Sequence, residues 1–410
     1  MMKELEKKLA KKGMQLGLGR VRKLLKFWKN PQEHYKVILV AGTNGKGSVT
    51  SYLSSILKEA GYKVGSYYSP HVVRYNERFR INGKMIPDKQ FRKYEKDVLN
   101  YAKKNPLTFF EALTGIAFKY FADQDVDWAV VEVGLGGRLD ATNIADAAIS
   151  VITNIDLEHT DVLGKSVQEI AFEKAGILKK GVGITGASSE ALEVIKQIAE
   201  EKGVTLKVLD EDFFAKDIKS DSNSTKFNYI GEDFYTNLET SLIGNYQASN
   251  AALAIAAVEQ IGVEGEAIKK GLKKAENFGR LQFVKKKPMV VFDAAHNVHG
   301  IKGLIENLSL FKYENLILVF GVMADKNWEG MVELIAPHAK LMVVNQPKIE
   351  RSADCKKVGA LAKQFTEARV IKDVKKSIKE AVKIAGRNDL VLVCGSIYML
   401  GEAFSVFKKK

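Results

Sequence analysis

The chain has 410 residues, of which 46% are hydrophobic and 27% are charged. This length exceeds what one hydrophobic core usually organises, so we expect two domains, and the ordinary composition excludes a disordered or collagen-like chain. The formal net charge of +14 would raise encounter rates with anions such as nucleotides or polycarboxylates, but the lysines are scattered, which favours the simpler interpretation that they serve solubility. Without an aromatic-basic module, no nucleic-acid partner is expected.

The sequence also bears on the compartment of the protein. No apolar run reaches the roughly 18 to 20 residues needed to span a bilayer. The basic N-terminus is interrupted by Glu4 and Glu6 and is not followed by the apolar segment of a secretory signal. Cys355 and Cys394 lie far apart in the chain, and Cys394 ends an apolar run, so buried free thiols are expected rather than a disulfide. We therefore expect a cytoplasmic protein without a membrane partner.

From Val37 onward, short runs of valine and isoleucine alternate with amphipathic stretches, as in parallel strands joined by crossover helices. The strands expected in this first series are 37–40, 64–68, 128–132, 148–153 and 183–186. Polar, turn-rich pieces from Leu206 to Ile243 predict short antiparallel strands instead. Helices are expected at 49–60, 250–261 and 265–275.

A second alternating series begins at Met289. Its expected strands are 289–292, 316–320, 340–344, 368–370 and 390–394. A short linker is expected at 278–288. The predicted fold class is therefore α/β. Residues 1–280 would form a domain with a mostly parallel sheet plus a small antiparallel sheet, and residues 281–410 a C-terminal α/β domain.

A glycine-rich segment follows the first expected strand and opens a helix. It consists of Gly42, Thr43, Asn44, Gly45, Lys46, Gly47 and Ser48. Glycines let backbone N–H groups turn toward phosphate oxygens, and the helix N-terminus adds a positive partial charge. Lys46 can reach the β- and γ-phosphates, while Ser48 offers a hydroxyl to Mg²⁺. A glycine-rich turn without a nucleotide is the alternative, but Lys46 and Ser48 together favour a nucleotide triphosphate.

Further polar groups are expected near this loop. Glu132 ends a buried-looking strand, and ligands of open α/β sheets bind outside the carboxyl ends of the strands, so its carboxylate would suit Mg²⁺. His159 follows the next strand, where it could serve a second metal site or simply cap a helix. Ser69 follows the strand expected at 64–68 and could add a hydroxyl. Lys174 lies in an expected helix, where a lysine is usually a solvated charge.

Taken in order, these segments resemble the motifs of the folylpolyglutamate synthase and dihydrofolate synthase family, within the Mur ligase superfamily. The resemblance covers about residues 16 to 401, nearly the whole chain. It implies that residues 1–280 form a P-loop ATPase-like domain and residues 281–410 a C-terminal Rossmann-like ligase domain. Its motifs are 42–48, 69–71, 132–143, 159–161, 173–177, 279–281, 293–297, 325–326 and 395–396.

The resemblance implies roles for the matched positions. ATP would be bound by the glycine-rich segment together with Asn250, Arg280 and Asp293. Two Mg²⁺ sites would be formed by Ser48, Ser69, Glu132 and His159. Lys174 matches a lysine that is carbamylated in these enzymes, a modification that converts a cation into an anion and needs a neutral amine. The catalytic residues implied are Lys46, His159 and Lys174.

The family's pterin-containing substrate would contact a further set of residues. These are Leu16, Thr108, Phe110, Asp140 and Ala141, with His296 on the second domain. For Phe110, ordinary core packing is an equal alternative. The chain departs from the family pattern at Tyr246, where histidine is common, at Ala294, where glycine is common, and at Gly19, where glutamate is frequent. It also lacks the usual Trp-Pro before Gly279.

The activity implied is an ATP-dependent ligase that adds L-glutamate to dihydropteroate, to the γ-carboxylate of reduced folates, or to both. The carboxylate would be activated as an acyl phosphate, with ADP and phosphate as products. Only small-molecule partners and a monomer are expected. Two alternatives stay open. One is a Mur-type ligase acting on a peptidoglycan precursor, for which the chain lacks an extra N-terminal domain; the other is a P-loop NTPase switch.

Overall fold

The computed structural model describes residues 3–9 and 15–407 and divides into two compact units. The first unit consists of Met1–Lys219, Lys226–Ser241 and Gln247–Glu276. The second consists of Ser220–Thr225, Leu242–Tyr246 and Asn277–Lys410. The main crossing from one unit to the other thus falls between Glu276 and Asn277, ahead of the boundary expected at residue 280.

A large, mostly parallel sheet forms the centre of the first unit. Over the described residues it has eight strands in the order β4-β3-β2-β5-β1-β6-β7-β8. The strands are β1 (Lys36–Ala41), β2 (Val64–Tyr67), β3 (Phe79–Ile81), β4 (Lys84–Met85), β5 (Trp128–Glu132), β6 (Ile149–Ile152), β7 (Val182–Thr185) and β8 (Thr205–Val208). Strand β3 pairs antiparallel with β2, and β4 with β3, whereas the other pairs are parallel. The central strands β1, β2, β5 and β6 are buried almost throughout, as expected for a parallel sheet covered on both faces.

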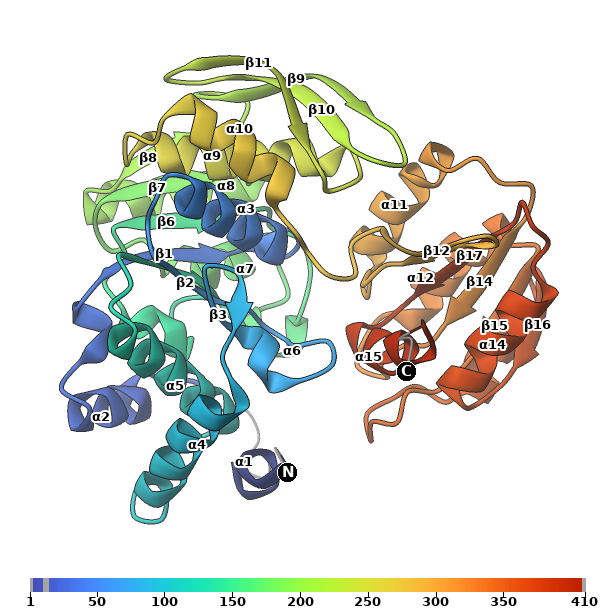
Figure 1. The fold of residues 1–410 in the computed structure, drawn as a ribbon, viewed down its shortest axis with the longest axis horizontal. Coiled ribbons are helices and arrows are strands. Elements are labelled where there is room, and N and C mark those ends of the chain that lie inside the picture. Colours follow the sequence, from blue (N-terminus) through green and yellow to red (C-terminus); the bar gives the residue numbers. More distant parts are fainter. Residues whose placement is uncertain (1–2, 10–14, 408–410) are drawn as a thin grey trace. The chain divides into compact units, whose positions relative to one another are not determined.

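Helices cover both faces of this sheet. Figure 1 shows α3, α9 and α10 on one side and α2, α4 and α5 on the other. The α-helices of the unit are α1 (Lys3–Leu9), α2 (Gly19–Phe27), α3 (Lys46–Glu59), α4 (Asp88–Ala102), α5 (Phe109–Asp123), α6 (Thr160–Leu163), α7 (Val167–Ala175), α8 (Ser189–Lys202), α9 (Tyr246–Glu259) and α10 (Gly265–Lys274). Short 3₁₀ helices are η2 (Pro31–Glu33), η3 (Tyr75–Arg78) and η4 (Ala141–Ile144).

A small sheet lies beyond α10, with the strand order β11-β10-β9. Its strands are β9 (Phe214–Ser220), β10 (Thr225–Ile230) and β11 (Phe234–Thr240). Short turns join consecutive strands, which is possible only for antiparallel neighbours. The turn-rich sequence therefore predicted this small sheet correctly. The prediction was wrong for β8, which was expected within the antiparallel region but pairs parallel with β7 in the large sheet.

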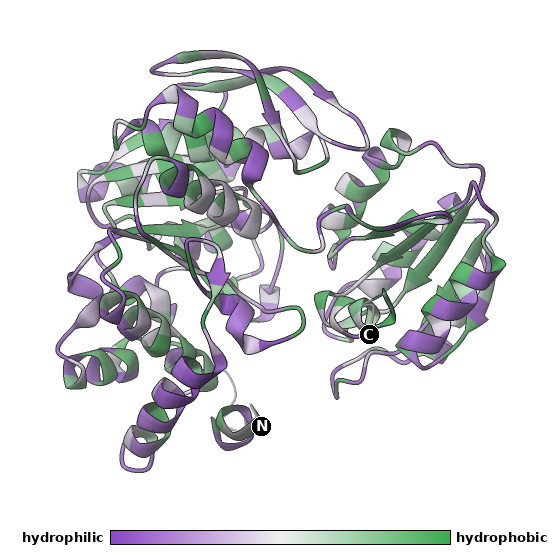
Figure 2. Cartoon of the chain, viewed as in Figure 1, coloured by the Kyte–Doolittle hydropathy of each residue, from purple (hydrophilic) through white to green (hydrophobic). Residues whose placement is uncertain are grey.

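The second unit has its own sheet, which over the described residues contains six strands in the order β12-β13-β17-β14-β15-β16. They are β12 (Gln282–Lys286), β13 (Met289–Phe292), β14 (Leu316–Phe320), β15 (Leu341–Val344), β16 (Glu367–Val370) and β17 (Leu390–Cys394). The helices are α11 (Val298–Glu306), η5 (Leu308–Leu310), α12 (Trp328–Ile335), η6 (Ala336–His338), α13 (Cys355–Ala362), α14 (Val374–Ile384) and α15 (Ile397–Phe407). In Figure 2 the inner strands are green and the outer face of α14 is purple, so the apolar core lies around the sheet.

The predicted α/β class with a P-loop ATPase-like and a Rossmann-like half is confirmed. Besides the pairing of β8, two further local expectations are wrong. The stretch 278–288, expected to be a linker, contains β12, which pairs antiparallel with β13. Helix α9 begins at Tyr246, four residues before the expected 250–261, because its first turn carries Gln247 and Ser249 instead of the apolar run that marks the rest of the helix. No helix within the described part of the chain is long and apolar enough to cross a membrane.

Candidate active site

The strand order of the first unit brings four polar segments to one edge of its sheet. Strands β2, β5, β1 and β6 are consecutive neighbours and run parallel, so their carboxyl ends meet. Val40, near the end of β1, lies opposite Glu132 at the end of β5, and Ala41 lies opposite Ile152 at the end of β6. The segments that begin at Ser69, Gly42 and Thr153 therefore start side by side with Glu132. This is the edge at which ligands of open α/β sheets bind.

The glycine-rich segment joins β1 to α3, as the sequence predicts. Gly45 caps α3 with a φ of 87°, and Gly42 has a φ of 138°, both in the region that favours glycine. A Cβ at Gly42 would lie 1.8 Å from Thr153 Oγ1, and one at Gly45 would lie 2.4 Å from Asn250 Oδ1. The loop is therefore packed too closely for any side chain at these two positions, and Asn250 of α9 lies directly against it.

The loop after β6 holds the glycine-rich segment through hydrogen bonds. The backbone N–H groups of Thr43 and Asn44 donate to the backbone and side-chain oxygens of Asn154, each at 2.8 Å. Thr153 Oγ1 donates to the Asn44 carbonyl at 2.5 Å, and the Asp156 N–H donates to Thr43 Oγ1 at 3.0 Å. These bonds fix the backbone that would face the phosphates, so little reorganisation is needed on binding.

Two lysines meet at this loop. Lys46 Nζ donates to the carbonyls of Gly42 and Thr43 at 2.9 Å each, and Lys174 Nζ donates to the Gly42 carbonyl at 2.5 Å. Lys174 is buried in α7 with 3% of its surface exposed, so it is not the solvated charge that its helical position suggests. Burial, and then the neighbouring charge of Lys46, lower the pKa of Lys174 from 10.5 to about 7, against the opposing effect of Glu158.

Oxygen donors for a cation gather at the same edge. Glu132 is 5% exposed, and its Oε2 accepts a hydrogen bond from the Ser69 N–H at 3.0 Å. Ser48 is 2% exposed in the first turn of α3. His159 follows β6 and caps the short helix α6 with its side chain exposed. Over the described residues, no three His, Cys, Asp or Glu side chains cluster as a metal site.

The segment after Glu132 packs tightly on the end of α7, which carries Lys174. A Cβ at Gly137 would lie 2.6 Å from the Lys174 carbonyl oxygen, and one at Gly176 would lie 2.3 Å from Arg138 Cβ. The Arg138 N–H donates to the Glu173 carbonyl at 2.7 Å, and the Arg138 guanidinium pairs with the Glu173 carboxylate at 2.6 Å. The two segments thus approach at backbone contact distance.

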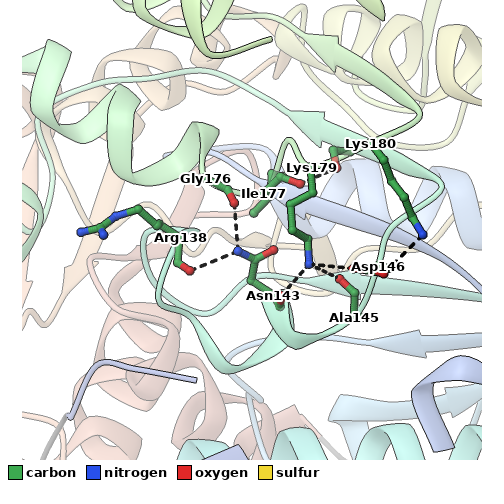
Figure 3. Close-up of polar contacts among 9 residues, drawn as sticks. Arg138, Asn143, Ala145, Asp146, Gly176, Ile177, Lys179 and Lys180 are labelled. Carbon is green, nitrogen blue, oxygen red and sulfur yellow. Dashed lines mark hydrogen bonds and ion pairs between the residues drawn. The ribbon is translucent and has the colours of Figure 1, made fainter. Parts of the chain in front are cut away.

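The side chain of Asn143 bridges these two segments, as Figure 3 shows. Its Nδ2 donates to the carbonyls of Arg138 at 3.1 Å and Gly176 at 2.9 Å. Lys179 Nζ donates in turn to the carbonyls of Asn143 at 2.8 Å and Ala145 at 2.6 Å, and lies 3.4 Å from an Asp146 oxygen. One buried amide and one partly buried lysine therefore fasten 3₁₀ helix η4 to the chain that leaves α7.

The residues expected to contact a pterin also converge on the first unit. Asp140 is buried and caps η4, accepting hydrogen bonds from the Thr142 and Leu135 N–H groups at 2.9 Å each, and burial raises its pKa. Thr108 caps α5, and the ring of Phe110 lies against Gly134, where a Cβ would be 2.4 Å from it. Helix α5 packs on η4, which contains the buried Ala141.

Leu16 is the outermost member of this set, being 40% exposed. Its neighbour Gly17 donates through its N–H to the Leu139 carbonyl at 3.3 Å, next to Asp140. The segment that precedes α2 is thus joined to the loop that follows Glu132.

Three predicted site residues lie in the second unit. Asp293, after β13, accepts hydrogen bonds from the Leu281 and Ala295 N–H groups at 2.9 and 2.8 Å, and burial raises its pKa although Arg280 opposes this. His296 Nδ1 lies 3.0 Å from the Ala294 carbonyl. Asp293 and His296 follow β13. The helix after β13 and the helix after the neighbouring strand β17 lie on opposite faces of the sheet, so these two residues lie at its topological switch point.

Comparisons with known proteins agree with this geometry. The Mur ligase middle domain family matches residues 40–258, and the Mur ligase glutamate ligase domain family matches residues 279–397. The dihydrofolate synthase/folylpolyglutamate synthase of Bacillus subtilis is 34% identical over 411 residues, covering 95% of this chain and 94% of that protein. The chain belongs to the dihydrofolate synthase/folylpolyglutamate synthase family of Mur ligases. It is therefore an ATP-dependent ligase.

Solved structures of the family have the same fold. A folylpolyglutamate synthase of Mycobacterium tuberculosis complexed with ADP has a TM-score of 0.92 at 28% identity, covering 99% of this chain and 97% of its own. The bifunctional folylpolyglutamate synthase/dihydrofolate synthase of Yersinia pestis with Mn, AMPPNP and L-glutamate bound has a TM-score of 0.85 at 31% identity, covering 96% and 94%. The resemblance inferred from the motifs is confirmed.

Sequence reasoning missed the residues that hold this Mur ligase site together. Asn143 and Glu173 lie within the recognised motifs, but nothing local reveals that they join the segment after Glu132 to the end of α7. Arg20, Lys179 and Asn154 lie outside those motifs, and each acts through partners distant in sequence. A signal was available only for Asn154, which follows a strand at the predicted ligand-binding edge.

Proposed function

We propose that this ligase joins L-glutamate to dihydropteroate, to the γ-carboxylate of reduced folates, or to both. The observation that carries the proposal is that one continuous segment leads from Glu132, beside the phosphate loop, to Asp140 and Ala141, against which helix α5 with Phe110 packs. We call the place where these residues meet the proposed acceptor pocket. An acceptor bound there would have its carboxylate directed toward the γ-phosphate of ATP.

The first step activates the carboxylate. An oxygen of the acceptor carboxylate attacks the γ-phosphorus, the bond to the ADP oxygen breaks, and an acyl phosphate forms. Lys46 would move from its present carbonyl partners to the phosphoryl oxygens and offset their negative charge. The fixed backbone of Thr43 and Asn44 supports positioning, which is the main source of catalysis in phosphoryl transfer.

ATP and a divalent metal ion are the cofactors of this reaction. Ser48, Ser69 and Glu132 fit such an ion, because the buried carboxylate of Glu132 lies beside two segments that each carry a hydroxyl group. His159 is proposed for a second site. Bound metal would neutralise part of the phosphate charge.

We also propose that Lys174 is carbamylated. With a pKa of about 7, a large fraction of its amine is neutral at physiological pH and able to attack CO₂, forming an N–C bond with release of one proton. The product is an anion beside Lys46. It would replace two cations near the Gly42 carbonyl with an opposite-charge pair.

In the second step, the glutamate amine attacks the acyl carbon and phosphate leaves through a tetrahedral intermediate. The amine loses one proton, and no covalent bond to the protein forms. Asn250, Arg280 and Asp293 are proposed as nucleotide contacts and His296 as a substrate contact, on the strength of the family motifs. Residues 1–280 would then form the P-loop ATP-binding domain, and residues 281–410 the C-terminal ligase domain.

We further propose that the protein acts as a cytoplasmic monomer. The two cysteines are free and buried, which supports a reducing compartment. Light scattering of the purified protein tests the oligomeric state.

The decisive experiment measures ADP release by purified protein with ATP, Mg²⁺ and L-glutamate. Dihydropteroate, tetrahydrofolate and no acceptor are compared, and product masses are read in parallel. Turnover with both acceptors, each gaining a glutamyl mass, establishes a bifunctional enzyme, and turnover with one assigns a single activity. ADP release independent of any acceptor would contradict the proposal and point to another carboxylate substrate or to an NTPase switch.

A further inference from the structure

An ion pair between residues far apart in sequence borders the acceptor pocket. Arg20, in the first turn of α2, places its Nε 2.9 and 3.0 Å from the two carboxylate oxygens of Glu111 in α5. The side chain of Glu111 is only 4% exposed and that of Arg20 is 26% exposed, so the pair is largely removed from water. Removing one partner of such a pair leaves a buried charge uncompensated, which is costly.

Each member of the pair also holds a segment of the pocket. Glu111 Oε2 accepts the Thr108 N–H at 2.7 Å, while the Glu111 N–H donates to Thr108 Oγ1 at 3.2 Å, forming a capping box. Arg20 Nη2 donates to the Gln15 carbonyl at 2.6 Å. The pair therefore links the start of α5, which leads into Phe110, to the segment that contains Leu16.

The same segment has a second attachment. Gly17 donates to the Leu139 carbonyl, beside Asp140, and adopts a φ of 125° that favours glycine. Further along, α2 packs closely on α5, because a Cβ at Gly115 would lie 2.4 Å from a methyl group of Leu24. The helices are thus in fixed contact, and the orientation of the segment before α2 depends on the Arg20 guanidinium and the Gly17 bond.

We propose that Arg20, through Glu111, is a positioning residue that sets the affinity for the acceptor substrate. This inference rests on the proposed function of the pocket. The hydrogen bonds of the pair run to Gln15 and Thr108, whereas the phosphate loop is held by the segment after β6. Loss of the pair should therefore weaken acceptor binding and leave ATP binding intact.

Three substitutions separate the parts of this role. R20M keeps the length of the side chain but leaves the Glu111 carboxylate without its cation. R20K keeps the charge, but one ammonium cannot bond to both carboxylate oxygens and to the Gln15 carbonyl in the guanidinium geometry. E111Q keeps a side chain that is compatible with the capping box, since glutamine is accepted at that position, but removes the negative charge.

The experiment measures KM for dihydropteroate, KM for ATP and kcat in each variant. In R20M the acceptor KM should rise about tenfold or more, while the ATP KM and kcat stay within about twofold, because only the acceptor pocket loses a fixed wall. R20K and E111Q should show smaller rises. The double variant R20M/E111Q should be no worse than R20M, because it removes the orphaned carboxylate.

The matched control is Arg369→Met, which breaks the exposed pair with Glu367 in the second unit and should leave both KM values unchanged. Equal rises of both KM values, or an unchanged acceptor KM in folded R20M and E111Q, would overturn the positioning role. If R20M does not fold, R20K and E111Q decide the question. A wild-type protein that neither binds nor converts dihydropteroate or tetrahydrofolate would instead overturn the proposed function and this inference with it.

Discussion

The phosphate loop and the acceptor pocket belong to the same unit, but different contacts hold them. The loop is fixed by backbone groups of Thr43 and Asn44 and by the absence of room for a Cβ at Gly42. The pocket is held by side chains such as Glu111 and Asn143, whose partners are distant in sequence. Loss of a functional side chain in the phosphate loop should therefore reduce activity without changing the conformation of the loop. Loss of a side chain that holds the acceptor pocket should instead change the conformation of the pocket.

The largest effect is expected at the phosphate end. Lys46→Ala should reduce kcat by about a thousandfold or more, because it removes the charge that offsets the transferring phosphoryl group. Its unfolding midpoint should change little, since the bonds from Thr153, Asn154 and Asp156 that hold the loop remain. Steady-state ADP release and thermal unfolding check both parts. The control Lys58→Ala, on the exposed side of the same helix α3, should behave as wild type. Near-normal turnover of Lys46→Ala would refute the assignment.

Lys174 lies where the two regions meet, and its effect on stability depends on pH. Its folded pKa of about 7 lies below the ordinary 10.5, so the unfolded chain binds more protons between these values and stability should rise with pH across that window. Lys174→Met should be more stable than wild type below pH 7, by on the order of a few kcal/mol, with the difference vanishing toward pH 10.5.

Urea unfolding at several pH values, in buffers depleted of CO₂, measures this difference. A difference that does not vary with pH would show that Lys174 does not titrate as its burial implies. Restoring CO₂ and recording the intact mass of the wild type tests the carbamate separately.

The side-chain clamp of the pocket is tested at Asn143. Asn143→Asp has the same shape but cannot donate to the Arg138 and Gly176 carbonyls, so stability should fall by about 2 kcal/mol in urea unfolding. The control is Asn388→Asp, which changes an exposed amide bonded to Glu314 and should cost less than about 0.5 kcal/mol. Equal losses in the two variants would mean that the clamp does not hold the pocket.

The smallest effect is expected for the metal requirement. Glu132→Gln should raise the Mg²⁺ concentration for half-maximal turnover about tenfold, because a neutral amide is a weaker ligand than a carboxylate. The amide oxygen can still accept the Ser69 N–H, so the backbone there should keep its position. An unchanged Mg²⁺ titration would count against Glu132 as a ligand. Glu33→Gln, which changes the exposed residue of helix η2, is the control.

Much of the fold could be predicted because its strands are short, apolar and regularly spaced. The ranges 128–132, 289–292, 316–320 and 390–394 coincide with β5, β13, β14 and β17. Strand β12 was missed because Gln282–Lys286 is polar and exposed at the sheet edge, without the apolar run that marks a central strand. The pairing of β8 depends on β7, which no local pattern in Thr205–Val208 specifies.

The candidate site could be predicted where its residues lie together in one short segment with a recognisable pattern. Gly42 and Lys46 lie in one short segment, so their joint role follows from spacing and from the strand that precedes them. The burial of Lys174 could not be predicted, because it results from packing of Gly137 on α7. The bond between Arg20 and Glu111 spans 91 residues and depends on how α2 packs on α5.

The close approach of Gly137 to the Lys174 carbonyl also limits the length of the chain between β5 and η4. Two backbones in contact leave no slack, so even one extra residue between Glu132 and Asp140 would displace Lys174 from the Gly42 carbonyl. The hairpin at Asp221–Ser224 has no such constraint, since its tip is largely exposed. A scan of short peptide insertions along the gene should therefore find the hairpin permissive for reporters or affinity tags and the 132–140 stretch closed to them.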